Sequence, residues 1–223
     1  YTPLPVLAAM FRTLAEGASV PVVAHLDHAY SFEECRIALD CGFTSLMYDG
    51  SKKPMSQNID ETARIAEMAH DAGISCEGEI GFVGYHGRAE SAGTDPEEAA
   101  QFARETGVDA MAISVGNVHL QTSSGDGLDE GRIRAIEAVT DVPLVIHGAS
   151  GVPVPQRTAL ARTSSICKYN IGTELRMAFG AALRDEGLGD DDKEQDGTRC
   201  TDVGANRGDH VPAGKGVRIV NIA

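Results

Sequence analysis

Several features that define common protein classes are missing from this 223-residue chain. No stretch approaches the roughly 20 consecutive apolar residues of a membrane span, which argues against a membrane protein. The first residues, YTPLPVLAAMFRTLAEG, lack the charged start, apolar run and cleavage site of a signal peptide. Lys and Arg total 19 against 33 Asp and Glu, for a net charge of −14. Because nucleic acids are bound by clusters of Lys and Arg, this balance argues against a nucleic-acid partner. Any anionic substrate must be held by a local site.

Paired cysteines are also absent. The five cysteines are scattered and none forms a CxxC pair: Cys35, Cys41, Cys76, Cys167 and Cys200. This spacing argues against a disulfide framework and against a cysteine-rich zinc module. It predicts a soluble protein of a reducing compartment, the cytoplasm. The chain does not begin with Met and opens inside a helical pattern, so we expect a preceding segment to be missing.

What is present is an alternation of short apolar runs with helix-length amphipathic segments. Continuous apolar runs of this length predict parallel strands that are buried on both faces. The predicted strands are Val20–His28, Thr44–Ser51, Ile74–Gly81, Asp109–Gly116, Pro143–Gly148 and Ile166–Thr173. The predicted helices are Pro3–Glu16, Ser31–Cys41, Ser56–Ala72, Asp95–Thr106, Asp129–Thr140, Pro153–Thr163 and Glu174–Arg184.

This order predicts an α/β fold, a TIM-type (β/α)8 barrel that is incomplete. Six βα units are expected, with the N-terminal units missing, Val20–His28 at one sheet edge and Ile166–Thr173 at the other. Barrel-interior side chains such as Val22, Val23, Met111 and Ile113 should then be exposed. Residues 1–186 are predicted to form the barrel domain. Residues 187–223 are charged, rich in glycine and without periodicity, which predicts an irregular tail with one strand at most, Val217–Ala223.

Every predicted strand ends in polar residues. Catalytic groups of parallel α/β folds gather at these ends, and three histidines from separate strands with carboxylates nearby suit a catalytic zinc ion. A single histidine at a strand end is more often a hydrogen-bonded structural residue. We give that interpretation to His70 and His210, and we expect His25 to support a neighbouring ligand from the face that it shares with Asp27.

The segments VVAHLDH, SLMYDGS, EGEIG, VGNVH, LVIHGASGVP and KYNIGTEL occur in this order from about Val20 to Ala182. Together they resemble the class II, zinc-dependent fructose/tagatose-bisphosphate aldolase family. The resemblance implies zinc ligation by His28, His119 and His147, with Glu79 as an alternate ligand. It places Asp49 close to a second cation position, which a monovalent cation would fill, and it makes Asp27 the catalytic acid/base. The segments that hold phosphate and the dihydroxyacetone moiety correspond to Gly148, Ala149, Ser150, Asn170, Ile171, Gly172 and Thr173.

The activity implied is reversible aldol cleavage of a ketose 1,6-bisphosphate to dihydroxyacetone phosphate and an aldehyde such as glyceraldehyde 3-phosphate. Family members are usually homo-oligomers. The chain departs from the family pattern after EGEIG, where a loop glutamate normally acts as a second acid/base. Glu90 is the nearest candidate and His86 a second, and Leu120 replaces a small residue.

Two other interpretations remain open at this stage. The chain could be an inactive zinc- and phosphate-binding homologue without turnover. It could also be a barrel that binds a phosphorylated ligand without metal, although this leaves the three strand-end histidines unused. The choice between fructose and tagatose bisphosphates is not determined by these residues.

Overall fold

The computed structural model describes residues 2–83, 93–120, 125 and 127–185. Its strands are β1 (His25–Ala29), β2 (Ser45–Tyr48), β3 (Ser75–Ile80), β4 (Ala110–Ile113), β5 (Leu144–Ile146) and β6 (Ile166–Tyr169). Its helices are α1 (Leu4–Glu16), α2 (Phe32–Asp40), α3 (Met55–Asp71), α4 (Pro96–Thr106), α5 (Glu130–Glu137), α6 (Val154–Thr163) and α7 (Thr173–Asp185). All predicted elements within this range are present, and the strands are shorter than predicted.

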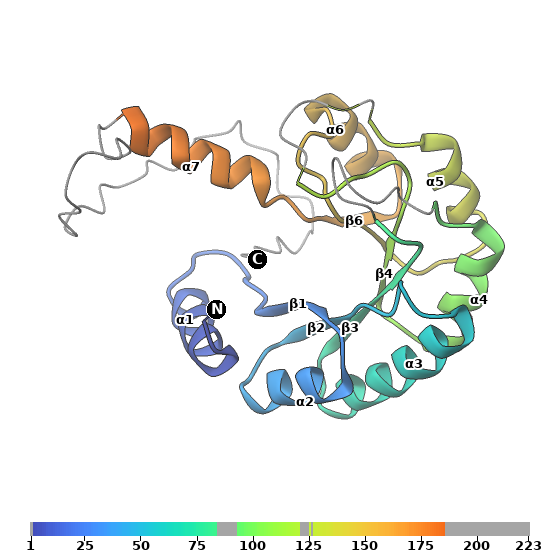
Figure 1. Cartoon of the computed structure of the whole chain (residues 1–223), viewed down its shortest axis with the longest axis horizontal. Helices are drawn as coiled ribbons and strands as arrows, with labels where there is room; N and C mark the ends of the chain where they lie inside the picture. Colours follow the sequence, from blue (N-terminus) through green and yellow to red (C-terminus); the bar gives the residue numbers. More distant parts are fainter. Residues whose placement is uncertain (1, 84–92, 121–124, 126, 186–223) are drawn as a thin grey trace.

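The strands form one parallel sheet in the order β1-β2-β3-β4-β5-β6. Figure 1 shows the sheet curling into an open arc with helices α2 to α6 on its convex side. This is the predicted incomplete barrel, with β1 and β6 as its two edges. The curvature brings side chains of the two edge strands into contact. Lys168 Nζ of β6 lies 3.2 Å from His25 Nε2 of β1.

Local sequence signals explain where two of the helices begin. Ser31 caps α2 by accepting a hydrogen bond from the backbone N–H of Glu34, and Asp95 caps α4 by accepting from Glu97 and Glu98. Each cap satisfies backbone donors that have no partner within the helix. Both helices therefore start at the residue that the sequence predicts.

The main apolar core lies between the sheet and its helices. Leu46, Tyr48, Phe102, Ile133 and Ile146 are buried there. A smaller cluster of Met47, Ala112 and Val145 faces the inside of the arc. Burial of each large side chain contributes roughly 1.5–3 kcal/mol.

The expectation that Met111 and Ile113 face the barrel interior is wrong. Both are fully buried in the main core, against the helices. Side chains alternate along a strand, so Ala112 between them is the residue that points inward. Val22 and Val23 precede β1 and are half-buried.

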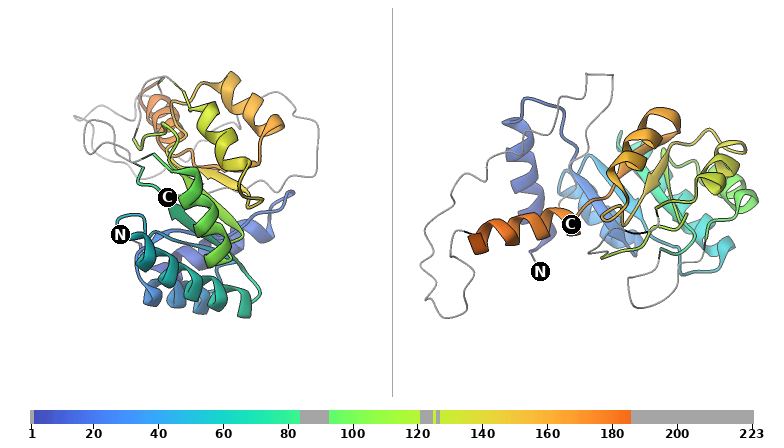
Figure 2. Two further views of the ribbon diagram at one scale, coloured as in Figure 1. Left: turned by 90° about the vertical axis from the view of Figure 1, so that its right-hand side faces the viewer. Right: turned by 90° about the horizontal axis from the view of Figure 1, so that it is seen from above.

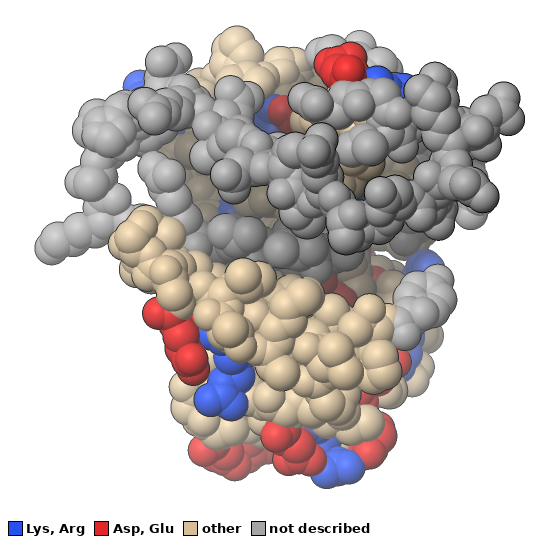
Figure 3. All heavy atoms as spheres, turned by 90° about the vertical axis from the view of Figure 1, so that its left-hand side faces the viewer, with Lys and Arg blue, Asp and Glu red and all other residues tan. Residues whose placement is uncertain are grey.

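Helices α1 and α7 flank the open side of the arc, and α7 extends away from the sheet (Figure 2). No residue of α7 is buried. On α1, Val6, Met10 and Leu14 are exposed one helical turn apart, and Figure 3 shows that uncharged residues make up most of the described surface on this side of the molecule. None of the described helices is long and apolar enough to cross a membrane. The predicted tail and its strand Val217–Ala223 lie outside the described residues.

Candidate metal centre and active site

An irregularity in β1 brings two consecutive residues to the site. Leu26 pairs with Leu46 and Ala29 with Tyr48, so β1 contains one residue more than β2 between these pairs. His28 takes up the extra residue with a left-handed φ of 54°. Bulges of this kind redirect side chains next to active sites. As a result Asp27 and His28 both line the same pocket, although neighbours on a regular strand point to opposite faces.

His28, His119 and His147 converge from three different strand ends. One nitrogen from each ring lies within 4.8 Å of the others. The ring centres are 4.6 Å apart for His28 and His147, 5.6 Å for His28 and His119, and 6.1 Å for His119 and His147. Two nitrogens that share a tetrahedral zinc ion at about 2.05 Å each lie roughly 3.3 Å apart. The three rings therefore require only small movements to bind one metal ion.

Carboxylates fix which ring nitrogens face the centre. His28 Nδ1 lies 2.9 Å from Asp49 Oδ2, and His147 Nε2 lies 2.9 Å from Glu77 Oε1. An N–H that donates to a carboxylate leaves the other ring nitrogen with a free lone pair. His28 thus presents Nε2 and His147 presents Nδ1, and these two atoms are 2.9 Å apart.

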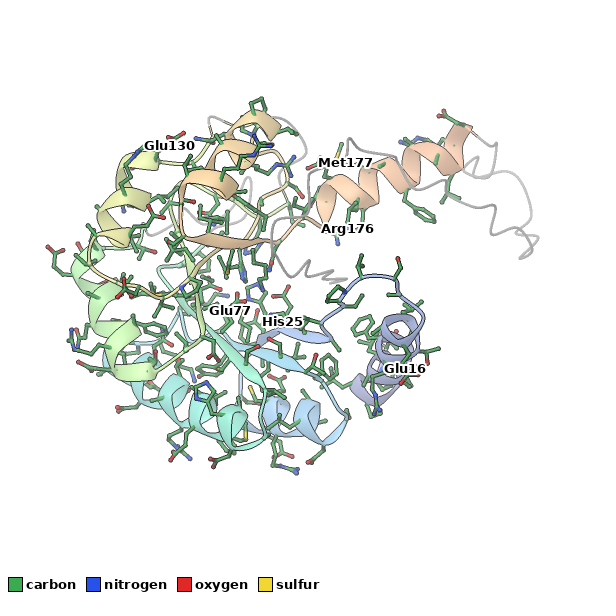
Figure 4. All side chains as sticks on the ribbon, turned by 180° about the vertical axis from the view of Figure 1, so that it is seen from behind. Glu16, His25, Glu77, Glu130, Arg176 and Met177 are labelled. Carbon is green, nitrogen blue, oxygen red and sulfur yellow. The ribbon has the colours of Figure 1, made fainter. Side chains whose placement is uncertain are left out.

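A buried cation beneath the centre supports Glu77. Lys168 Nζ lies 2.5 Å from Glu77 Oε2 and 3.2 Å from His25 Nε2. All three side chains are buried, and Figure 4 shows His25 and Glu77 on the concave side of the sheet. Burial opposes ionisation of Glu77, but the charge of Lys168 and the hydrogen bond from His147 hold its pKa well below the usual range. Burial and the charge of Lys168 lower the pKa of His25 to about 4.

The pKa values of two of these histidines move in opposite directions. Burial favours the neutral form of His28, but its hydrogen bond to Asp49 and the charge of Asp27 outweigh this effect and raise its pKa to about 9. Burial and the neighbouring His147 lower the pKa of His119 to about 4. Negative charge is therefore concentrated around His28, which favours a cation at this position.

Glu79 is a good candidate metal ligand, because one of its carboxylate oxygens is buried without another partner. Its side chain is 2% exposed, and among the described residues its Oε2 has no hydrogen-bond donor. This oxygen lies 3.7 Å from His28 Nδ1 and 3.9 Å from His147 Nδ1. Burial raises the pKa of Glu79 to about 7. A buried, unsatisfied carboxylate oxygen is costly in a protein, and a bound cation would remove that cost.

The loops after β5 and β6 form one wall of the pocket. Ala149 N–H donates to the Asn170 carbonyl at 3.0 Å, which ties the two loops together. Gly148 has a left-handed φ of 58°, and a Cβ there would lie 2.6 Å from the Val118 carbonyl. The pocket is lined by Asp27, His28, His119, Leu120, Gly148, Ser150, Asn170, Ile171, Gly172, Thr173 and Arg176. All but Ala149 of the predicted phosphate-binding residues line it.

A model of the family described as fructose-bisphosphate aldolase class-II matches residues 1–207. The chain belongs to this family. The 6-phospho-5-dehydro-2-deoxy-D-gluconate aldolase of Shouchella clausii is 42% identical over 183 residues, which cover 80% of this chain and 62% of that protein. The fructose-bisphosphate aldolase of Geobacillus stearothermophilus is 37% identical over 174 residues, covering 75% and 59%.

Two solved aldolase structures share the fold. The YdjI aldolase from Escherichia coli K12 superposes with a TM-score of 0.73 at 33% identity, covering 83% of this chain and 66% of that chain. A putative fructose-1,6-bisphosphate aldolase from Coccidioides immitis gives a TM-score of 0.71 at 28% identity, covering 81% and 67%. The chain therefore spans about three fifths of the length of these two curated relatives and about two thirds of these two solved chains.

Most residues that the sequence assigned to a class II aldolase site meet at this centre, and three further ones were missed. Glu77, Lys168 and Arg176 were not assigned a role from sequence. Glu77 could have been predicted, because it lies two residues before Glu79 and therefore on the same face of the strand. Nothing in the sequence marks Lys168 as a partner of Glu77. Glu90 and His86 lie outside the described residues, as does His210. His70 is exposed on α3 and contacts Asp109, away from the site.

Proposed function

We propose that this chain carries the active site of a zinc-dependent aldolase for a phosphorylated ketose. The products would be dihydroxyacetone phosphate and an aldehyde such as glyceraldehyde 3-phosphate. The observation that carries the proposal is the convergence of three histidines, two of which line the same pocket as Asp27, opposite a wall formed by the β5 and β6 loops. A triose phosphate fits this combination because it offers a carbonyl to the metal side and a phosphate to the loop side.

His28, His119 and His147 would hold the ion, and Glu79 would be its alternate ligand. A bound zinc ion would act as a Lewis acid toward the ketose carbonyl and stabilise the negative charge that develops during cleavage. Asp49 and Glu77 would keep the ligand rings in the correct tautomers. Asp49 also belongs to a second group of potential ligands with His28 and Glu79, and this group supports the predicted second cation position.

Asp27 would accept the proton of the C4 hydroxyl during cleavage and return it during condensation. Its carboxylate is suited to this role because it is ionised. Burial opposes ionisation, but the nearby His147 and His28 hold the pKa of Asp27 below its usual value. Asn170 Nδ2 donates to Asp27 Oδ1 at 3.3 Å and orients it toward the pocket. Asn170 Oδ1 is buried without a donor among the described residues, so it can accept a hydrogen bond from a substrate hydroxyl.

The loop residues would bind the phosphate through backbone N–H groups at the start of α7. The partially positive end of a helix attracts anions, and Gly172 and Thr173 lie at this end. Glu174 N–H already donates to Ser150 Oγ at 3.2 Å, which holds the helix start against the β5 loop. Many (β/α)8 barrels bind the phosphate of their ligands at the loops after the last two strands and at a nearby helix N-terminus.

We propose a ketose 1,6-bisphosphate of the fructose or tagatose type as the substrate. The relatives are named for two substrates, fructose bisphosphate and 6-phospho-5-dehydro-2-deoxy-D-gluconate. In both compounds the keto carbon is next to a phosphorylated terminal carbon, so the two differ at the end that lies away from this shared phosphate. One alternative is binding of metal and phosphate without turnover.

The test is release of dihydroxyacetone phosphate, measured with a coupled dehydrogenase. Fructose 1,6-bisphosphate, tagatose 1,6-bisphosphate and 6-phospho-5-dehydro-2-deoxy-D-gluconate are supplied separately, before and after treatment with a chelator. Release from one of the two ketose bisphosphates that stops with chelator and returns with zinc would support the proposal. Binding of zinc and phosphate without release from any substrate would support the alternative.

A further inference from the structure

Two residues other than glycine adopt a left-handed backbone in the described part of the chain, and both line the candidate active site. They are His28, with a φ of 54°, and Leu120, with a φ of 59°. The bulge in β1 accounts for His28. A bulky side chain is rare in this conformation, because its Cβ crowds the following carbonyl oxygen. Strained residues cluster at functional sites, so the backbone of Leu120 points to a role in the pocket.

The loop that leads into Leu120 is anchored to the end of β5. Asn117 is buried, and its Nδ2 donates a hydrogen bond to the His147 carbonyl at 2.9 Å. The Val118 carbonyl lies against Gly148, where a Cβ would be only 2.6 Å away. The path of the chain is therefore fixed just before Leu120, and these contacts hold the strained residue in place.

The side chain of Leu120 belongs to the wall of the pocket that carries the histidines. Leu120 directly follows His119, it lines the pocket, and it is 54% exposed. The other large apolar residue among the described lining residues is Ile171, which lies on the opposite wall in the β6 loop. The pocket encloses about 150 Å³, which is small beside the roughly 300–1,000 Å³ of most ligand pockets. A leucine on this wall therefore takes up space next to the reacting part of a bound ligand.

We propose that Leu120 is a specificity-determining residue that limits the bulk of the aldehyde half of the substrate. This inference rests on the proposed function. The metal and the β5 and β6 loops would hold the keto and phosphate groups, which are the same in the two compounds for which the relatives are named. These compounds differ in the half that is released as the aldehyde. Leu120 would favour an aldehyde with a CH2 group next to its carbonyl over one that is branched at this carbon.

The test measures condensation of dihydroxyacetone phosphate with propanal and with 2-methylpropanal by the zinc-loaded chain. The two aldehydes differ by one methyl group on the carbon next to the carbonyl. The parent chain should prefer propanal. Leu120→Gly and Leu120→Ala should raise kcat/KM for 2-methylpropanal relative to propanal by about 10- to 100-fold, the size expected when one methyl group no longer meets a steric limit. Consumption of dihydroxyacetone phosphate, followed with a coupled dehydrogenase, gives the rates.

A second measurement tests the strained conformation without any substrate. Both substitutions remove the side chain, but only glycine adopts a left-handed φ without strain. Leu120→Gly should therefore unfold at a higher urea concentration than Leu120→Ala. Equal unfolding midpoints would contradict the left-handed backbone at Leu120 and would overturn the inference.

Val139→Ala is the matched control for Leu120→Ala, because Val139 is also an exposed apolar residue and does not line the pocket. It should leave the ratio of the two kcat/KM values within about twofold of the parent. No gain on 2-methylpropanal relative to propanal in either Leu120 variant would overturn the inference and leave the aldolase proposal intact. A parent chain that neither cleaves a ketose phosphate nor condenses dihydroxyacetone phosphate with an aldehyde would overturn the aldolase proposal, and this inference with it.

Discussion

Nδ1 of His147 and Nε2 of His28 lie 2.9 Å apart, although 119 positions separate the two residues in the chain. Each ring is held from its far side by a carboxylate, Glu77 for His147 and Asp49 for His28. The two lone pairs are thereby aimed at one point, and His119 completes the group from a third strand end.

Substitution His147→Ala should abolish zinc binding and aldolase activity together. The side chain is fully buried and offers Nδ1 to the centre, so no other described histidine can replace it. Zinc content after dialysis, measured by atomic emission, checks this. His70→Ala is the control, because His70 is exposed on α3, and it should keep its zinc. A His147→Ala chain that retains one zinc per chain would contradict the ligand assignment.

Asp27→Asn should keep the metal and lose cleavage. Removing a general base typically costs 10²- to 10⁴-fold in rate, and Asn has nearly the same shape as Asp. The measurement is kcat for release of dihydroxyacetone phosphate together with zinc content. If Asp27→Asn turned over at the parental rate, Asp27 would not be the acid/base.

Glu77→Gln should weaken zinc binding about 10- to 100-fold, since loss of a carboxylate behind a ligand histidine has effects of this size. Lys168→Met should weaken it in the same direction, because it leaves Glu77 buried without its cation. Lys168→Arg, which keeps the charge, should restore part of the affinity. Competition with a chelator measures all three variants. Unchanged zinc affinity in both Glu77→Gln and Lys168→Met would show that the contacts beneath His147 do not position it.

Zinc affinity should rise as pH increases from 6 to 9. His28 has a pKa raised to about 9 and must lose a proton to bind metal, so affinity increases up to that pH. Glu79, with a pKa raised to about 7, must also lose a proton below pH 7, which makes the dependence steeper there. Chelator competition at several pH values gives the slope. Glu79→Gln should remove the extra steepness below pH 7, and an affinity that is flat from pH 6 to 9 would contradict this account.

Gly148→Ala should destabilise the chain more than Gly107→Ala. Both glycines have a left-handed φ, so both substitutions incur the conformational cost of roughly 1–2 kcal/mol. A Cβ at Gly148 would also lie 2.6 Å from the Val118 carbonyl, whereas one at Gly107 would meet nothing within 4 Å. Urea denaturation of the two variants measures the difference. Equal free energies of unfolding would show that the backbone at Val118 moves away from the added methyl group without a cost in stability.

The strand positions were predictable from sequence because parallel strands buried on both faces give continuous apolar runs. The ends of the strands were less predictable. The strand predicted from Val20 begins only at His25, and β6 ends at Tyr169 rather than at Thr173. The direction of side chains was harder still. Met111 and Ile113 were expected to face inward, and only the register of β4 shows that Ala112 does.

The candidate site residues that the sequence predicts stand in motifs at strand ends, as His28 and His147 do. The role of Lys168 could not be predicted from sequence, because it depends on contact with Glu77, which lies on a strand three positions away in the sheet. The bulge at His28 was also beyond sequence reasoning, since it follows from the pairing of β1 with β2. Arg176 sits in an ordinary amphipathic helix, and only the pocket geometry singles it out.

The most direct test of the account is the anomalous scattering map of a zinc-soaked crystal recorded at the zinc absorption edge. We expect one strong peak per chain, about 2.1 Å from His28 Nε2, His147 Nδ1 and a nitrogen of His119. A peak at another place, or full zinc occupancy without any one of these three histidines as a ligand, would contradict it.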